Sequence, residues 1–150
     1  MNEPPAPILV LAVGNPSRGD DALGPALAER LEAAAAPGVE VITDFQLQVE
    51  HALDLVGRRL VIFVDASIGT TAPFEWRRIT PAPDFLHTSH ALSPEAVLAT
   101  YMRVQKEQPP ECWALCVRGE TFELGAALSA AAGECLEAAW RALEQACRCH

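Results

Sequence analysis

Two adjacent carboxylates follow the first apolar run of the chain, in the stretch GNPSRGDDALG, and another carboxylate ends a later apolar run. They are Asp20 and Asp21 after residues 8–13, and Asp65 after residues 60–64. His90 lies in the irregular stretch TPAPDFLHTSHAL, just before the sequence SPEAVL. Two carboxylates and an imidazole form a ligand set that suits a borderline divalent cation such as Zn²⁺ or Ni²⁺. Such a set leaves positions open for water or for ligands from a second protein.

Each of these residues also has a purely structural interpretation. Asp20 or Asp21 could cap a helix, the commonest role of an aspartate at a strand-to-helix turn. Asp65 could cap a turn at the end of its strand, and His90 could be an ordinary loop side chain. Taken singly, none of them establishes a functional site.

The elements that must position these side chains follow from the apolar pattern. A continuous apolar run over residues 8–13 is typical of a strand buried on both faces. Leucines spaced by four from Leu23 predict a helix that the pair Pro37-Gly38 ends. The expected elements are a strand over 8–13, a helix over 21–36, a strand over 39–42, a helix over 48–56, strands over 60–64 and 74–79, a helix that Ser93 caps, a strand over 112–117, and a helix within 124–146.

This order predicts a single-domain α/β fold over residues 1–150, with a doubly wound, mostly parallel five-stranded sheet and helices on both faces. The connection 66–73 is shorter than the dozen or so residues of a parallel crossover. We therefore expect the strand over 74–79 to run antiparallel to its predecessor. Residues 1–7 and 147–150 are expected to be loose ends.

The expected topology brings the two carboxylates together. Ligands of open α/β sheets bind beyond the carboxyl ends of the strands, where the strand order reverses. In the common order 2-1-3, the first and third strands are neighbours, so Asp21 and Asp65 should face each other across one crevice. The helix that Ser93 caps must also start at this edge, and the stretch before it is long enough to bring His90 to the same rim.

Composition excludes several classes of partner. The chain has 11 basic and 20 acidic residues and a formal net charge of −9, which disfavours both nucleic acid and anionic membrane surfaces. The start MNEPPAP and the short apolar run after it do not form a signal peptide or a membrane span. We expect a cytoplasmic protein whose five cysteines are reduced thiols.

Other motifs are weak or absent. The turn GNPSRG does not match the dinucleotide fingerprint G-x-G-x-x-G, and the sequences H-E-x-x-H and C-x-x-C do not occur. Cys112 and Cys116 are spaced to share one face of a strand and are expected in the core. The tail CRCH, with Cys147, Cys149 and His150, is either a metal-binding cluster or a frayed end.

Three stretches together resemble the [NiFe]-hydrogenase maturation proteases, over roughly residues 8–142. VGNPSRGDDALG matches the family pattern G-N-x-x-x-x-D-[DE]-x-x-G. VIFVDA contains a strand that ends on the family's metal-binding aspartate, and SHALSPEAVL contains the family's histidine. The family consists of endopeptidases that trim the C-terminal tail of the hydrogenase large subunit after nickel insertion. The resemblance implies the same α/β fold and activity for this chain.

The resemblance also implies roles for individual residues. The family's metal-contacting positions fall on Asp21, Asp65 and His90, with Asp20 as an alternative for the first. Asp21 is preferred because it directly precedes the small residue of the sequence DDA. The family implies nickel supplied by the precursor rather than a permanent cofactor, with Zn or Cd as substitutes in vitro. The expected partner of a monomeric enzyme is the nickel-loaded precursor of a large subunit.

Two departures from the family pattern concern substrate recognition. Ala22 stands where many members have glycine, and TDFQLQVEH replaces the common loop D-G-G-T. This loop and the stretch VRGETFELGAALS resemble the branch that serves NAD-coupled, bidirectional-type hydrogenases. Asp44 in this loop and Asn15 are assigned to substrate binding, since Asn15 could hydrogen-bond the tail or a developing oxyanion. Alternatively, Asn15 only shapes its turn.

Overall fold

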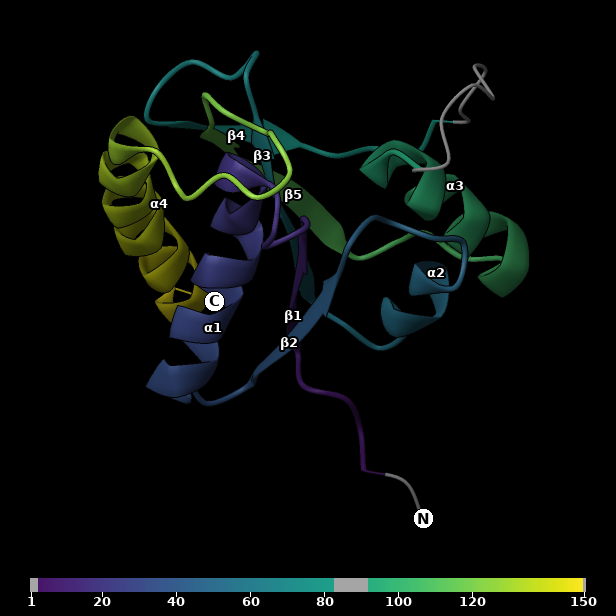
Figure 1. Ribbon diagram of the computed structural model, residues 1–150. Helices are drawn as coiled ribbons and strands as arrows, with labels where there is room; N and C mark the ends of the chain where they lie inside the picture. Colours follow the sequence, from purple (N-terminus) through teal and green to yellow (C-terminus); the bar gives the residue numbers. More distant parts are fainter. Residues whose placement is uncertain (1–2, 83–91, 150) are drawn as a thin grey trace.

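A computed structural model describes residues 3–82 and 92–149 of the chain (Figure 1). The elements, in order, are β1 (Ile8–Val13), the 3₁₀ helix η1 (Gly19–Ala22), α1 (Leu23–Ala34), β2 (Val39–Asp44), α2 (His51–Asp54), β3 (Leu60–Ser67), β4 (Phe74–Arg78), α3 (Pro94–Gln105), β5 (Glu111–Arg118) and α4 (Ala130–Arg148).

One five-stranded sheet with the order β2-β1-β3-β5-β4 forms the centre of the molecule. The pairs β2–β1, β1–β3 and β3–β5 are parallel, whereas β4 pairs antiparallel with β5. The predicted α/β class, the order 2-1-3 and the antiparallel direction of β4 are confirmed. The short connection 66–73 carries β4 past the position next to β3, so its hydrogen-bonded neighbour is β5.

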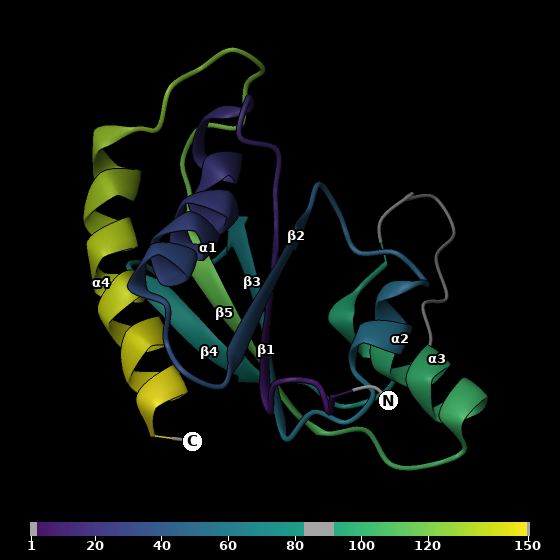
Figure 2. The same ribbon diagram turned by 90° about the horizontal axis from the view of Figure 1, so that it is seen from below.

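Helices cover both faces of this sheet, as the apolar pattern predicted. Figures 1 and 2 show α1 and α4 on one side of the strands and α2 with α3 on the other. Alternate residues of β1 enter two separate cores: Ile8, Val10 and Ala12 pack toward α1 and α4, and the residues between them pack toward α2 and α3. Because every side chain of β1 is buried, the strand reads as an uninterrupted apolar run.

Two helices differ from the predicted ranges. The helix expected over 48–56 is α-helical only from His51 to Asp54, because the turns before and after it use the tighter i→i−3 hydrogen bonds. The last helix begins at Ala130, where Ser129 caps it by accepting a hydrogen bond from the Ala132 N–H at 3.1 Å. It runs on to Arg148, so Cys147, which we expected in a loose tail, is buried against the core.

The five cysteines are all free thiols in this fold. Within residues 3–82 and 92–149, no helix is both long enough and apolar enough to cross a membrane.

Candidate active site

Two glycines of the sequence motif bring the end of β1 against the start of α1. A Cβ at Gly14, where φ is +148°, would lie 2.0 Å from the backbone oxygen of Asp21. A Cβ at Gly24 would lie 2.4 Å from the backbone oxygen of Val13. Only glycine permits these approaches, and they place the two aspartates of η1 directly at the carboxyl edge of the sheet.

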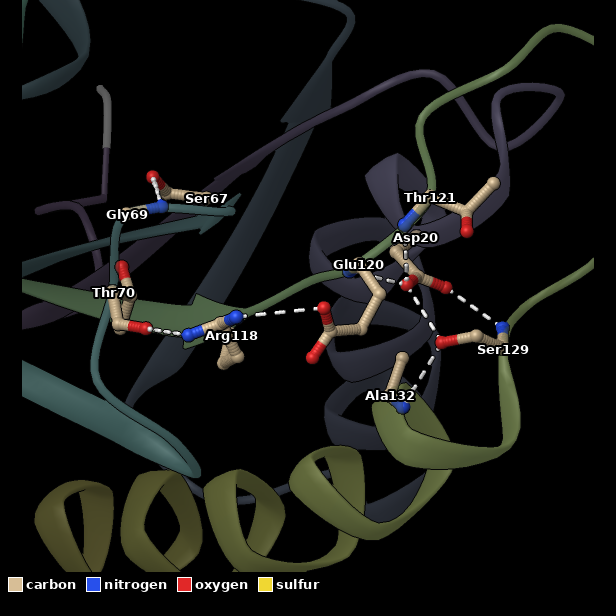
Figure 3. A network of polar contacts seen from close by, with 9 residues as sticks. All are labelled: Asp20, Ser67, Gly69, Thr70, Arg118, Glu120, Thr121, Ser129 and Ala132. Carbon is tan, nitrogen blue, oxygen red and sulfur yellow. Dashed lines mark hydrogen bonds and ion pairs between the residues drawn. The ribbon is translucent and has the colours of Figure 1, made fainter.

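Asp20 points away from the sheet crevice into a fully buried hydrogen-bond network (Figure 3). Its Oδ2 accepts from the N–H groups of Glu120 at 2.7 Å and Thr121 at 3.1 Å. Ser129 contributes two further donors, its N–H to Oδ1 at 2.8 Å and its hydroxyl to Oδ2 at 2.7 Å. The carboxylate therefore ties η1 to the connection between β5 and α4.

The protonation of Asp20 follows from these contacts. Burial alone raises the pKa of a carboxyl group, but the hydrogen bonds from Ser129, Glu120 and Thr121 outweigh it, and the pKa of Asp20 is lowered. The charged carboxylate also lies at the N-terminus of α4, where the helix dipole favours an anion. Asp20 is thus a permanently ionised structural group whose oxygens are occupied.

Asp21 points in the other direction and is half-buried at the edge of the sheet. Its Oδ2 accepts a hydrogen bond from the Asn15 N–H at 2.7 Å. The Asn15 side chain accepts from the Ser17 N–H at 2.9 Å, so it shapes the turn that holds Asp21. Neither aspartate caps a helix, because the residues at the N-cap positions of η1 and α1 are Arg18 and Ala22.

Asp21 and Asp65 line the same cavity, as the predicted crevice required. It has a volume of about 310 Å³ and lies at the carboxyl edge, on the face that α2 and α3 cover. Its floor comes from the ends of β1, β3 and β5, and its walls come from residues 45–47 and from Leu92 and Pro94. The Leu92 N–H donates to the Leu47 carbonyl at 3.4 Å and joins the two walls.

Asp65 is the first residue of β3 beyond its ladder with β1, which stops at the pair Ala12 and Val64. Its Oδ1 accepts from the Ala66 N–H at 2.7 Å. The side chain opens to solvent through the cavity, yet protein atoms crowd its carboxyl group, and this desolvation raises the pKa to about 6. The Ala66 hydrogen bond opposes the shift, and the nearby charge of Asp21 adds to it.

Asp44 ends β2 beside this cavity but makes different contacts. Its Oδ1 accepts from the Phe45 N–H at 2.7 Å, and its Oδ2 lies 3.4 Å from His51 Nε2. The other ring nitrogen of His51 accepts from the Gln48 N–H at 2.8 Å, which leaves the proton of the neutral ring on Nε2, toward Asp44. The pair fixes the connection between β2 and α2 rather than entering the cavity.

The third member of the predicted triad, His90, lies outside the described residues, and so does His150 of the tail. Within residues 3–82 and 92–149, no group of three or more His, Cys, Asp or Glu side chains is arranged to hold a metal ion. The structure therefore brings together Asp21 and Asp65 of the predicted site residues. Leu92, two positions after His90 in the sequence, lines their cavity.

Sequence reasoning missed two polar side chains that line this cavity, Arg77 of β4 and Cys116 of β5. Arg77 forms an ion pair with Glu95 in the first turn of α3, and Cys116 is the register partner of Asp65. Burial raises the pKa of the Cys116 thiol, while the adjacent Arg77 opposes the shift. Cys116 was expected in the core, and only its place opposite Asp65 in the sheet register could have predicted its position.

Another cavity, of about 320 Å³, lies at the opposite end of the sheet between β4, β5 and the end of α4. Apolar side chains such as Trp76 and Trp113 line most of it, and it contains a single carboxylate, Glu111. Paired carboxylates, a raised pKa and a position at the strand-order reversal favour the cavity of Asp21 and Asp65 as the active site.

Comparison with known proteins concerns the fold as a whole. No family model matches the chain, and no curated protein sequence matches it. Among solved structures, the hydrogenase maturating endopeptidase HybD from E. coli superposes with a TM-score of 0.72 at 27% identity, covering 94% of this chain and 91% of its own. The endopeptidase HycI from E. coli gives 0.68 at 25% identity, with 92% and 89% covered.

A more distant protein shares the fold. The [NiFe] hydrogenase maturation protease HycI from Thermococcus kodakarensis KOD1 gives a TM-score of 0.72 at 21% identity, covering 95% of this chain and 93% of its own. The family resemblance and the enzyme class that the sequence predicted are confirmed by these neighbours. This chain has the structure of a hydrogenase maturation protease.

Proposed function

We propose that this protein is an endopeptidase that removes the C-terminal extension of a [NiFe]-hydrogenase large-subunit precursor after nickel insertion. The observation that carries the proposal is the pair Asp21 and Asp65 in one cavity at the carboxyl edge of the sheet, in a chain similar to hydrogenase maturation endopeptidases over more than nine-tenths of its length. In this proposal the nickel belongs to the substrate, and the enzyme has no resident metal.

Asp21, Asp65 and His90 are proposed to contact the nickel that the precursor holds. Asp21 and Asp65 each use one carboxylate oxygen for a backbone N–H, and no other hydrogen-bond donor to either carboxylate is recorded in the described part of the chain. Desolvation is the main cause of the raised pKa of Asp65, and the like charge of Asp21 adds to it. A divalent cation between them would relieve this repulsion, so a nickel-loaded precursor would bind more tightly than a nickel-free one.

Hydrolysis of the scissile bond needs an activated water. One route lowers the pKa of a water by contact with the nickel of the precursor, and the other transfers its proton to a free carboxylate oxygen. In the second route, the carboxylate oxygen of Asp65 that does not contact nickel would accept the proton, and before nickel arrives the pKa of this group is about 6.

Substrate binding is assigned to the turn between β1 and η1 and to Asp44. The backbone N–H groups of Gly14, Asn15, Ser17, Arg18 and Gly19 already donate within the protein, and Pro16 has none. The side-chain oxygen of Asn15 is engaged in the turn, so the NH₂ of the Asn15 side chain is the donor of this turn proposed to bind the tail or a developing oxyanion. Asp44, held by His51, would meet the precursor at the entrance to the cavity. Its loop sequence favours a precursor of the NAD-coupled, bidirectional type.

An in vitro processing assay tests the proposal directly. Metal-stripped enzyme is mixed with a purified large-subunit precursor, with and without nickel, and loss of the tail is followed by mass spectrometry. Precursors from NAD-coupled and from other [NiFe]-hydrogenases are compared. We expect cleavage of the nickel-loaded precursor alone, with preference for the NAD-coupled type.

The other outcomes separate the alternatives. Cleavage regardless of nickel would indicate a self-sufficient metal-dependent peptidase, which should then purify with a stoichiometric metal. Binding without cleavage of any precursor would indicate a non-catalytic nickel-binding or nucleotide-binding module on the same fold.

Substitution of the histidine tests its place in the triad. His90→Ala should abolish processing while the urea unfolding midpoint stays at the wild-type value, because in this proposal the change removes a contact to the nickel of the precursor. His87→Ala, three positions away in the same stretch, is the matched control and should remain active. A folded and fully active His90→Ala protein would remove the histidine from the site.

A further inference from the structure

Apolar side chains gather on the surface beside the active-site cavity. Eight large apolar residues are exposed in the described part of the chain, and five of them belong to the β2–α2 connection, to α2 and its C-terminal turn, or to α3. They are Phe45, Val49, Leu53, Val56 and Val104. Clusters of this kind on a soluble domain mark interaction surfaces more often than chance.

Part of this apolar surface forms a groove. It has a volume of about 220 Å³ and lies between α2 and α3, which pack against each other (Figure 2). Val49, Leu53 and Val104 line it with exposed fractions of 54%, 61% and 56%, and the buried ring of Tyr101 lies beneath them. The groove is therefore a preformed apolar site.

The groove and the active-site cavity are lined by neighbouring residues of one connection. Residues 45–50 connect β2 to α2, and this one connection contributes to both hollows. Phe45 lines the cavity and is 66% exposed, while Val49, four positions later, lines the groove. The Asp44–His51 pair joins the two ends of the connection and so fixes the position of the groove relative to the cavity.

Charge argues against a second copy of this chain as the occupant. Each copy carries a formal net charge of −9, so two copies repel each other at low ionic strength. The short separation of Phe45, which lines the cavity, from Val49, which lines the groove, instead favours the molecule whose tail occupies the cavity. On the proposed function, that molecule is the folded large-subunit precursor.

We propose that the surface formed by Phe45, Val49, Leu53 and Val104 docks an apolar patch on the folded body of the precursor, next to the tail. The inference rests on the proposed function and adds a second contact to it. Docking on this surface binds the precursor, while the carboxylates of the cavity carry out the cleavage. Substitution of the apolar side chains of this surface should therefore raise KM and leave kcat unchanged.

The test uses Leu53→Glu and Val104→Glu, two substitutions of exposed side chains outside the cavity. Trp76→Glu is the matched control, because Trp76 is a partly exposed apolar residue on the opposite face of the sheet, and the added charge is the same. Each variant is checked for a wild-type circular dichroism spectrum. KM and kcat are measured on the nickel-loaded precursor, and binding of the same precursor is measured by titration calorimetry.

We expect KM and Kd to rise roughly tenfold or more in the two groove variants, with kcat unchanged and the control like wild type. Groove variants with the KM of wild type would overturn the docking surface and leave the proposed function standing. Wild-type enzyme that binds the precursor through the groove without cutting it would overturn the proteolysis alone. Wild-type enzyme that neither binds nor cuts it would overturn both.

Discussion

Two neighbouring aspartates with the same chemistry take opposite roles in this protein. Asp20 is buried and accepts four hydrogen bonds, whereas Asp21 faces the cavity and accepts one from a backbone N–H. A one-residue step along η1 turns the side chain from the α4 side of the molecule to the α2–α3 side. The pair Asp20 and Asp21 thus combines one residue that fixes the turn with one that lines the cavity.

The two aspartates should respond differently to substitution. Asp20→Ala leaves buried donors on Glu120, Thr121 and Ser129 without an acceptor and should lower the free energy of unfolding by about 3 kcal/mol. Asp21→Asn keeps a side-chain oxygen that accepts from the Asn15 N–H, so the free energy of unfolding should change by less than about 1 kcal/mol. The same substitution should abolish processing. Urea unfolding and the processing assay measure both effects. An equally stable Asp20→Ala protein would contradict the structural role.

The pKa of Asp65 predicts that this residue reduces stability at neutral pH. Its folded-state pKa is about 6 against an ordinary value of 3.8, so between these pH values the folded chain keeps a proton that the unfolded chain has lost. Stability therefore falls as the pH rises through this window. Asp65→Asn should raise the free energy of unfolding by about 1 kcal/mol near pH 8, a value that allows for solvent screening of this exposed group. Below about pH 4 the substitution should have almost no effect, because Asp65 is then largely neutral in both states.

Urea unfolding curves at the two pH values measure this difference. A gain that does not depend on pH would show that the carboxylate of Asp65 is not destabilised by its surroundings. A stabilised but inactive variant would be an example of a functional site that costs stability.

Sequence reasoning predicted that Asp21 and Asp65 lie in one cavity, but it gave no structural reason why Asp21 rather than Asp20 lies there. Strand order follows from local apolar runs, and the strand ends then locate Asp21 and Asp65. The donors to Asp20 come from residues about one hundred positions away, and nothing local in GNPSRGDD indicates them. Arg77 was missed for the same reason, because its place depends on the pairing of β4 with β5.

At the scale of elements, the contact between β1 and α1 sets the position of the site. Gly24→Ala would place a methyl group against the Val13 carbonyl oxygen at 2.4 Å, so η1 and Asp21 must shift. The free energy of unfolding should fall by about 2–3 kcal/mol, with a loss of processing. Gly133→Ala in α4 meets no atom within 4 Å and should instead stabilise the helix by up to about 1 kcal/mol.

Thermal or urea unfolding of the two alanine variants makes this comparison. If Gly24→Ala is as stable and active as wild type, the close approach of β1 and α1 is not needed for the site.

Elements with strong periodic patterns were predicted well, and those that depend on distant contacts were not. β1, β3 and α3 lie within a few residues of their predicted bounds, because burial and the cap at Ser93 act locally. The segment of α2 is shorter than its apolar pattern predicts because i→i−3 hydrogen bonds replace α-helical ones in the turns before and after it. The pair between His51 and Asp44 also needs the end of β2 in place.

At the scale of the whole molecule, one sheet contributes to two cores and should couple them. Tryptophan fluorescence reports one layer, since Trp76, Trp113 and Trp140 all lie on the α1–α4 side. Far-ultraviolet circular dichroism reports the helices of both layers. Because β1 and β3 supply alternate side chains to both cores, we expect the two signals to share one urea midpoint. Separate midpoints would mean that the α2–α3 layer unfolds independently.

The hydrogen bonds of Asp20 also have a consequence for biosynthesis. The turn that presents Asp21 leaves the ribosome about one hundred residues before the donors that hold it, which belong to residues 120–129. A nascent chain can place Asp21 and Asp65 in their final arrangement only after residues 120–129 have been synthesised. Premature termination before Ser129 should therefore yield a protein without proteolytic activity, so that unfinished copies of the enzyme do not cut the precursors made beside them.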